Sequence, residues 1–261
     1  MSVRLLLTDE AWDDIKLLLN EIKRKDGRRP VISDRLFIEA VLYIARTGIP
    51  YRDLPKEFGN WSAIYNRLRR WTKNGTWEKL WKQLQNDKLQ LSENLFIDST
   101  CVRAHQHAAG ASEKSGGQSA QALGRSSGGF STKIHFGCLS ENHAIAIHIT
   151  AGQFPDVKGF DSVMAELPED NAIKNGVMDK GYDSDDIRKQ LTELEIVPVI
   201  PPKKNRVIPI PYDAELYKER NRIERFINRM KQFRRIATRY EKLAETFIAF
   251  LHIIASYVAI R

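Results

Sequence analysis

The sequence predicts a mixed α/β fold in which an N-terminal all-α region precedes a sheet covered by helices. Residues 1 to about 90 show helical periodicity with capping residues at the helix ends. Beyond residue 94, short apolar runs are followed by alternating helical and strand segments, which is typical of a covered mixed sheet. The 261 residues have room for two modest domains, which we place at 1–90 and 91–261.

The N-terminal region contains strong helix boundary signals. Thr8 can cap a helix that begins with two acidic residues, and Ser33 can cap a second helix that ends at Gly48. Two short helical segments follow, at 51–58 and 61–75, and Gly59 lies in the turn between them. This arrangement favours a helix-turn-helix.

The second segment of that pair is amphipathic and basic. Its apolar face consists of Trp61, Ile64, Tyr65, Leu68 and Trp71. The cations lie mostly off this face, and they are Arg67, Arg69, Arg70 and Lys73. Such a helix can enter a major groove or contact phosphates, but an ordinary amphipathic helix with a solvated basic face has the same pattern. We expect Trp61, Trp71, Trp77 and Trp81 to lie in the core.

The second half alternates between strand and helix patterns. Strands are expected at 94–98, 130–139, 143–151, 176–179 and 195–200, and helices at 160–167, 184–194, 217–231 and 247–260. The Gly- and Ser-rich segment 108–129 predicts a flexible loop. The apolar segment 247–260 is shorter than the ~20 residues that a bilayer span needs, so we expect a buried helix packed on the sheet.

Charge and cysteine content narrow the functional class. The net charge is +8, from 41 basic and 33 acidic residues, which favours a polyanionic partner, nucleic acid before membrane. A merely basic soluble protein is the alternative. Cys101 and Cys138 are too few for a disulfide framework, and the N-terminus lacks the pattern of a secretory signal. We therefore expect a cytoplasmic protein without a membrane span.

Two acidic residues follow apolar strand patterns. Asp98 ends the run LFID and Asp179 ends GVMD. Strand ends of open α/β sheets commonly present ligand-binding groups, so the two carboxylates could converge if their strands are neighbours. The alternative is that the two carboxylates are unrelated and simply lie at the solvent-exposed ends of their strands.

The segment 217–231 combines charge with a helical apolar stripe. Taken as one helix, it places Tyr217, Arg220, Glu224 and Lys231 within an arc of about 60°. Glu224 lies at the border of the apolar face, whereas Glu219 falls among the apolar positions and is hard to explain. A few carboxylates with basic neighbours suit Mg²⁺, which prefers oxygen ligands, and two such ions support in-line displacement at phosphorus.

Other candidates carry weaker signals. His105 and His107 form an H-x-H pair that could bind zinc, but no third ligand with suitable spacing is evident. Lys133 and His135 follow the Gly-rich segment and could approach DNA, although ordinary strand polarity explains them as well. Phosphate contacts are also expected of a basic loop formed by Lys203, Lys204 and Arg206.

These residues together resemble a known family. The spacing of Tyr217, Arg220, Glu224 and Lys231 matches the Y-R-E-K signature of bacterial insertion-sequence DDE transposases. With LFIDST around Asp98, VMDKGY and the segment GRSSGGFSTKIH, the chain resembles the insertion-sequence-five family over essentially its whole length.

The resemblance implies a ribonuclease H-like catalytic core in which Asp98, Asp179 and Glu224 form the DDE triad and bind two Mg²⁺ or Mn²⁺ ions. Only residues 180–223 separate the second acid from the third, which leaves no room for a large β-insertion. The family cuts its element ends and joins the freed 3′-hydroxyls to target DNA, as dimers or higher oligomers.

On this basis the N-terminal helices are expected to recognise terminal inverted repeats, and Tyr217, Arg220 and Lys231 to contact DNA. The expected location is the bacterial cytoplasm, in association with the nucleoid. A non-catalytic DNA-binding descendant of a transposase, and a nuclease without strand transfer, are the alternatives.

Overall fold

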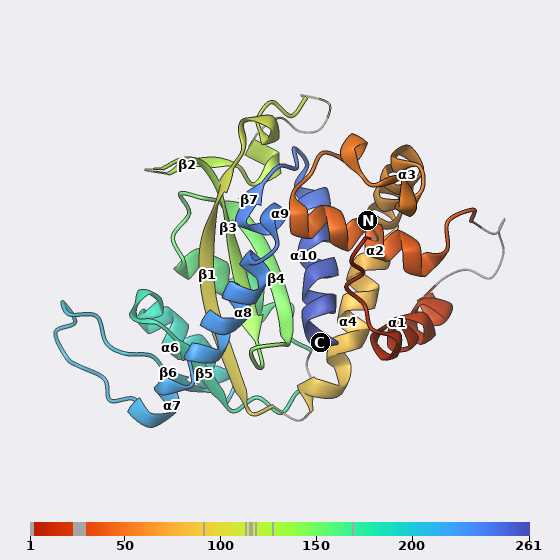
Figure 1. The fold of residues 1–261 in the computed structure, drawn as a ribbon. Helices are drawn as coiled ribbons and strands as arrows, with labels where there is room; N and C mark the ends of the chain where they lie inside the picture. The colour runs from red at the N-terminus through yellow and green to blue at the C-terminus, as the bar shows by residue number, and fades with distance from the viewer. Residues whose placement is uncertain are drawn as a thin grey trace.

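The computed structural model describes residues 3–22, 30–90, 92–112, 114, 117, 119–126, 128–168 and 170–261. A twisted sheet occupies one side of the molecule and the N-terminal helices the other (Figure 1). The C-terminal helix α10 (Ala244–Ala259) lies between them and packs on both strand β4 (Ala144–Ala151) and helix α4 (Thr76–Leu89). The predicted buried helix at 247–260 is therefore confirmed.

The N-terminal helices begin and end at the predicted signals. The other helices of this region are α1 (Asp9–Ile22), α2 (Asp34–Thr47) and α3 (Trp61–Lys73). The Thr8 hydroxyl accepts a hydrogen bond from the Ala11 amide, and the Ser33 hydroxyl accepts one from the Leu36 amide. Gly48 ends α2 with a φ of 72°, the left-handed conformation that glycine adopts without a steric penalty.

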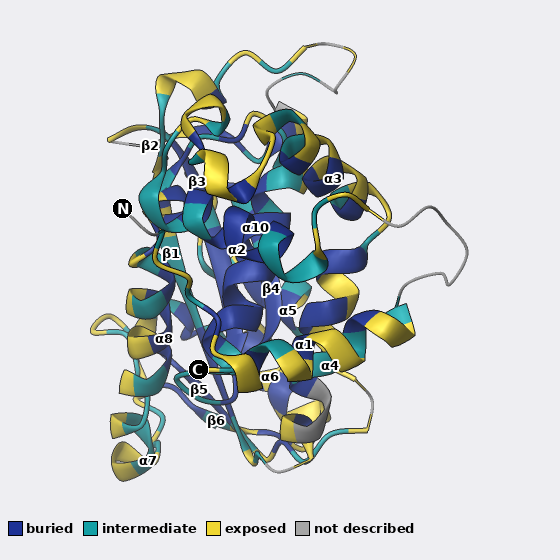
Figure 2. Cartoon of the chain, turned by 45° about the vertical axis from the view of Figure 1, so that its right-hand side comes forward, coloured by how far each residue is buried: buried dark blue, intermediate teal, exposed yellow. Residues whose placement is uncertain are grey.

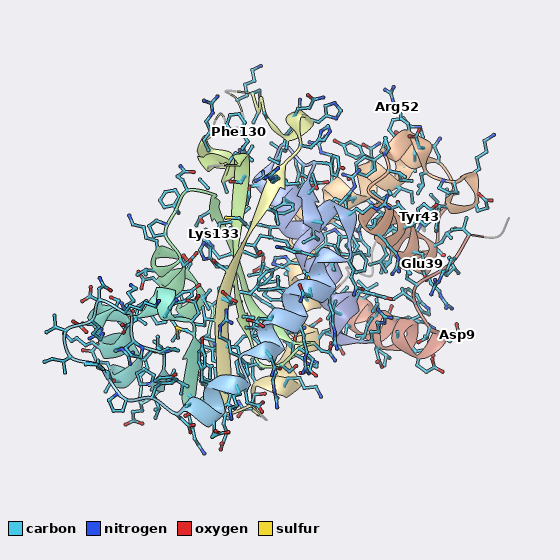
Figure 3. The ribbon with its side chains drawn as sticks, turned by 60° about the vertical axis from the view of Figure 1, so that its left-hand side comes forward. Asp9, Glu39, Tyr43, Arg52, Phe130 and Lys133 are labelled. Atoms are coloured by element: carbon cyan, nitrogen blue, oxygen red, sulfur yellow. The ribbon has the colours of Figure 1, made fainter. Side chains whose placement is uncertain are left out.

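Glu39 attaches the chain start to α2 (Figure 3). Its carboxylate is buried and accepts hydrogen bonds of 2.8 Å from the amides of Leu6 and Leu7. The structure differs from expectation at 51–58, which forms two 3₁₀ turns, η1 (Tyr51–Asp53) and η2 (Lys56–Phe58), and no helix. Pro55 explains the break, because it has no amide hydrogen and disfavours the helical conformation at the residue before it.

The sheet is mixed, because β1 (Asn94–Ala104) pairs antiparallel with β3 (Gly129–Cys138) and parallel with β5 (Asn175–Met178). Its other strands are β2 (Gly124–Ser126), β4, β6 (Val197–Val199) and β7 (Thr238–Arg239). The central order is β4-β3-β1-β5-β6, in which β3 pairs antiparallel with its neighbours and β1, β5 and β6 run parallel.

Strand β1 is longer than predicted. It continues past Asp98 to Ala104, because residues 99–103 pair with β3 from His135 to Ser131. Its pairing with β5, however, ends at Ile97 opposite Met178. Asp98 therefore lies inside a strand, but at the level where the neighbouring parallel strand stops.

The helices on the sheet are α5 (Val157–Met164), α6 (Asp185–Glu193), α7 (Ala214–Lys218), α8 (Asn221–Lys231) and α9 (Arg234–Ala237). The predicted single helix at 217–231 is thus two helices, α7 and α8. The Arg220 and Arg222 amides bond the carbonyls three residues earlier, those of Tyr217 and Glu219, which tightens the chain at the break. This explains the misplaced Glu219: it lies off the apolar face of α8 and pairs with Arg222.

The segment 108–129 is only partly a loop. It contains the end of η3 (Gln106–Ala108), η5 (Ser119–Gln121) and β2, while residues 113, 115, 116, 118 and 127 lie outside the described residues.

One core joins the N-terminal helices to the sheet. It contains residues of α1–α4, of β1 and β3, and of α8 and α10, and α10 is dark blue along most of its length in Figure 2. The division at residue 90 remains a prediction. Trp71, Trp77 and Trp81 are buried as expected, but Trp61 is exposed and lies under the Arg52 guanidinium. In the described part of the chain, no helix is long and apolar enough to cross a membrane.

Candidate active site

Three elements bring Asp98, Asp179 and Glu224 to one edge of the sheet. Ile97 on β1 pairs with Met178, the last residue of β5, so Asp98 on β1 and Asp179 directly after β5 lie beside each other at the end of the parallel ladder. Glu224 comes from the first turn of α8, which packs on β1 through its apolar stripe. That stripe consists of Ile223, Phe226, Ile227 and Met230, all buried.

Arg220 connects two of the acids. Its Nη2 lies 2.7 Å from Asp98 Oδ2, and its Nη1 donates a hydrogen bond to Glu224 Oε1. Because both contacts are made by one guanidinium, the Asp98 and Glu224 carboxylates lie within hydrogen-bond reach of the same side chain. The structure thus places Arg220 and Glu224 one helical turn apart, as predicted, and brings both to Asp98.

Asp98 lies in a partly buried, electrostatically strained position. Burial raises its pKa to about 6, and the negative charges of Asp179 and Asp156 add to the rise. The Arg220 charge and a hydrogen bond from the Ser99 amide act in the opposite direction. A nearby cation stabilises the charged form of a carboxylate in this environment.

Asp179 is oriented by the turn that follows it. Its Oδ1 accepts a 2.7 Å hydrogen bond from the Gly181 amide in η6 (Lys180–Tyr182). A Cβ at residue 181 would lie 2.8 Å from that oxygen, so a larger residue there would push the Asp179 carboxylate away from this position. Only one carboxylate oxygen is engaged in this way.

The other signature residues surround the acids. Lys231 Nζ lies 2.5 Å from Thr100 Oγ1 on β1. Tyr217, although on the separate helix α7, packs edge-on against Tyr212. Burial raises its pKa, and the nearby charges of Asp179 and Glu224 contribute to the rise. All four signature residues therefore lie around one site despite the helix break.

A fourth carboxylate lies next to Asp98, and no sequence pattern predicted it there. Asp156 Oδ1 accepts hydrogen bonds from Ser99 Oγ at 2.5 Å and from Lys133 Nζ at 2.7 Å, and Figure 3 shows Lys133 on the sheet. Lys133, expected near DNA, is thus paired with an acid. Asp156 precedes α5 without any strand-end pattern, so only the fold reveals its position next to Asp98.

Two other candidate DNA contacts, Arg67 and His135, are buried. Arg67 is 6% exposed, pairs with Asp34 and donates a 2.9 Å hydrogen bond to the Ile32 carbonyl, so it holds α3 against α2. His135 is fully buried and bonds Thr150, with α5 directly over its ring at Gly159. A buried side chain cannot reach a phosphate. Arg69, Arg70 and Lys73 are exposed on α3.

The basic loop is partly neutralised. Arg206 pairs with Asp183 and Asp185, and Lys203 Nζ donates to the Asp183 carbonyl. Lys204 is exposed. The two histidines of the H-x-H pair contact each other, and His105 also stacks on Tyr240.

The side chains of Asp98, Asp179 and Glu224 are chemically suited to bind a divalent cation. In the part of the chain that the structure describes, no three His, Cys, Asp or Glu side chains are gathered closely enough to hold a metal ion. Asp98 and Glu224 both bond the Arg220 guanidinium. The donors are carboxylate oxygens, which Mg²⁺ and Mn²⁺ prefer, and a small cation can replace the guanidinium's charge.

Family models match the chain along its length. The family described as "Putative transposase of IS4/5 family" matches residues 7–81. Two families described as "Transposase DDE domain" match residues 90–211 and 177–261.

Curated relatives agree with these matches. An uncharacterized protein of Sinorhizobium fredii is 39% identical over 112 residues, which cover 43% of this chain and 87% of that protein. A putative transposase for insertion sequence element IS6501 of Brucella ovis is 30% identical over 131 residues, covering 50% of this chain and 98% of that protein.

Solved structures show a more distant likeness. A piggyBac transposase in a synaptic complex with hairpin DNA is 13% identical, with a TM-score of 0.39 over 78% of this chain. The chain spans about half (51%) of that protein's length. The Mos1 mariner paired end complex with Mn is 15% identical, with a TM-score of 0.29 over 73% of this chain and 65% of the other.

Proposed function

The chain belongs to the IS4/5 family of insertion-sequence DDE transposases, and from that premise we propose that it cuts and joins DNA at the ends of its own element. The proposal is that Asp98, Asp179 and Glu224 are its catalytic acids. The observation that carries it is the single guanidinium of Arg220 held between Asp98 and Glu224, with Asp179 beside Asp98 at the sheet edge.

In this proposal the three carboxylates hold two Mg²⁺ ions, with Mn²⁺ as a substitute. Bound there, the ions supply an activated water or hydroxyl and stabilise the leaving oxygen. The protein's own part is positional. Strands β1 and β5 present two acids at one level, the packed stripe of α8 fixes the third, and Gly181 orients Asp179 through its amide.

The basic residues of the site would hold the DNA backbone. Arg220, released from the two acids, can bind a phosphate with two parallel hydrogen bonds. Lys231 sits beside β1 at Thr100 and can contact the next phosphate. Tyr217 offers a hydroxyl or a stacking face on the α7 side. Cleavage and joining differ only in the nucleophile, water first and a DNA 3′-hydroxyl second.

Recognition of the terminal inverted repeats is assigned to the helical region 1–90. The exposed cations of α3, which are Arg69, Arg70 and Lys73, are the proposed phosphate or base contacts; Lys204 is a further one. Arg67 is left out because of its burial. Paired ends imply a homodimer or higher oligomer on DNA, in the bacterial cytoplasm at the nucleoid.

The test is cleavage and joining of duplexes that carry the element ends, taken from the DNA that flanks the coding region. Asp98→Asn, Asp179→Asn or Glu224→Gln should each abolish Mg²⁺-dependent cleavage and leave DNA binding intact. Full activity in any one of them contradicts the triad assignment. Cleavage without joining would instead indicate a nuclease, and binding without either step a non-catalytic descendant.

A further inference from the structure

A stiff loop projects from the protein beside the candidate active site. Residues 201–213 join β6 to α7 and extend away from the sheet at the lower left of Figure 1. The loop contains four prolines, Pro201, Pro202, Pro209 and Pro211. Each proline fixes its own φ and restricts the residue before it, so the loop loses little conformational entropy when it binds a partner.

An ionic cluster anchors this loop at its base. The Asp183 side chain is 1% exposed, and its Oδ2 accepts hydrogen bonds from the Lys203 amide at 2.8 Å and from Arg206 Nε at 2.9 Å. Its Oδ1 accepts a 2.9 Å hydrogen bond from Arg188 of α6. Asp185 binds the other end of the Arg206 guanidinium. The loop is therefore attached to α6 and its preceding turn by three of these charge-assisted contacts, which Lys203 and Arg206 make with Asp183 and Asp185.

Beyond this anchor the loop presents two bare aliphatic side chains. Val207 is 95% exposed and Ile208 is 75% exposed. Single exposed aliphatic residues are ordinary. Two adjacent ones, held out by an ionic anchor on one side and Pro209 on the other, form a rigid apolar tip with nothing of the described chain against it.

The sheet register places the loop next to the acids. Val199 on β6 pairs with Val177 on β5, so two residues further Pro201 lies level with Asp179. The far end of the loop returns to the same site, because Tyr212 packs on Tyr217. The two ends of the loop therefore lie beside the acids, and its tip projects outward from them.

The loop's charge indicates the kind of partner. Residues 201–213 contain three cations and one acidic residue, Asp213. Arg206 is paired with Asp183 and Asp185, and Lys204 is exposed. The exposed charge of Lys204 attracts a phosphate backbone. Proteins that bind the minor groove of DNA frequently insert apolar side chains such as isoleucine between base steps and partly unstack them.

From these observations we propose that the Val207–Ile208 tip is a wedge that inserts between base pairs of the DNA beside the scissile bond. The proposal rests on the proposed function, since it takes element DNA as the partner. Its role would be to bend or open the duplex so that the scissile phosphate reaches Asp98 and Asp179.

A photo-crosslinking residue in place of Ile208 tests the wedge directly. The probe is a labelled duplex of the element end, and binding is measured separately by gel shift. We expect a crosslink to DNA from position 208 and none from the matched control position Leu194, which is also aliphatic and exposed (57%) but lies after α6. A crosslink to a second copy, or none while DNA is bound, overturns the wedge. Failure to bind DNA at all overturns the proposed function with it.

A second experiment measures unstacking. A 2-aminopurine base next to the scissile position should brighten when the wild-type protein binds. Val207→Ser with Ile208→Ser should abolish at least half of that increase and slow cleavage about tenfold, while Leu194→Ser leaves both unchanged. Because all three side chains are exposed, equal thermal stability is expected. An undiminished signal in the double variant contradicts the wedge even where cleavage by wild type confirms the enzyme.

Discussion

Replacing Arg220 by alanine tests how much its contacts with Asp98 and Glu224 contribute to stability. In the metal-free protein this change removes both hydrogen bonds of the guanidinium. The contact with Asp98 is largely buried, with side-chain exposures of 17% and 15%, and a hydrogen bond to a charged group of this kind is worth about 1.5–3 kcal/mol. Glu224 is 53% exposed, so that contact adds only about 0.5 kcal/mol.

The expected loss of stability is therefore about 2–3 kcal/mol, which for a chain of this size lowers the melting temperature by roughly 4–10 °C. Thermal unfolding followed by circular dichroism in EDTA measures it. The matched control is Arg222→Ala, because Arg222 pairs with Glu219 on the same helix at 41% and 42% exposure and should cost less than about 0.5 kcal/mol.

Adding a divalent metal should change which of the two proteins, wild type or Arg220→Ala, is more stable. The guanidinium and a cation compete for the same carboxylates, so the variant should gain more stability from Mn²⁺ than the wild type and bind it more tightly in calorimetry. The reasoning is refuted if Arg220→Ala melts within 1 °C of wild type in EDTA, or if its affinity for Mn²⁺ is unchanged or lower.

Three further predictions concern other parts of the structure. Asp183 is buried, yet hydrogen bonds led by Arg206 lower its pKa to about 2. Its ion pairs thus stabilise the protein above about pH 4, and about 2 kcal/mol should be lost as the pH falls from about 4 to about 2; urea unfolding should show this pH dependence in wild type and not in Asp183→Asn. Arg67→Ala should lower the free energy of unfolding by about 3–5 kcal/mol, because it breaks a buried ion pair. Arg69→Ala should leave the stability in urea unchanged and reduce the salt dependence of DNA binding by about one phosphate contact. The reverse result would restore Arg67 as a DNA contact. Gly159→Ala should destabilise by about 1–3 kcal/mol, because its Cβ would lie 2.0 Å from the buried His135 ring; unchanged thermal stability would show that the packing there is looser.

The elements that the sequence predicted best are those whose signals are local. Capping by Thr8 and Ser33, the stop at Gly48 and the apolar stripe of α8 depend on residues a few positions apart, and the structure has them where they were expected. The strand before Asp179 is another example, since β5 ends directly before the acid.

The sequence-based predictions were wrong where long-range contacts determine the structure. Pairing with β3 extends β1 beyond Asp98, which a short apolar run does not indicate. Arg67 carries the same charge as Arg69, but only the neighbouring α2 determines that Asp34 and the Ile32 carbonyl bury it. The break between α7 and α8 has no proline or glycine, so helical periodicity alone gave no sign of it.

The site itself was only partly accessible from the sequence. The order and spacing of Asp98, Asp179 and Glu224 make them the candidate acids by resemblance to the family. Asp156 has no such motif, and it comes next to Asp98 through the hydrogen bonds of Ser99 and Lys133.

The most direct test of the central claim is to map the metal site chemically. Fe²⁺ bound in place of Mg²⁺, with ascorbate and peroxide, generates radicals that cut the protein chain next to the ion. Cuts are expected near Asp98, Asp179 and Glu224 together, suppressed by excess Mg²⁺ and lost in Asp98→Asn. Cuts confined to another region, such as the pair His105 and His107, or cuts that persist in Asp98→Asn, would contradict the claim that these three acids form one metal site.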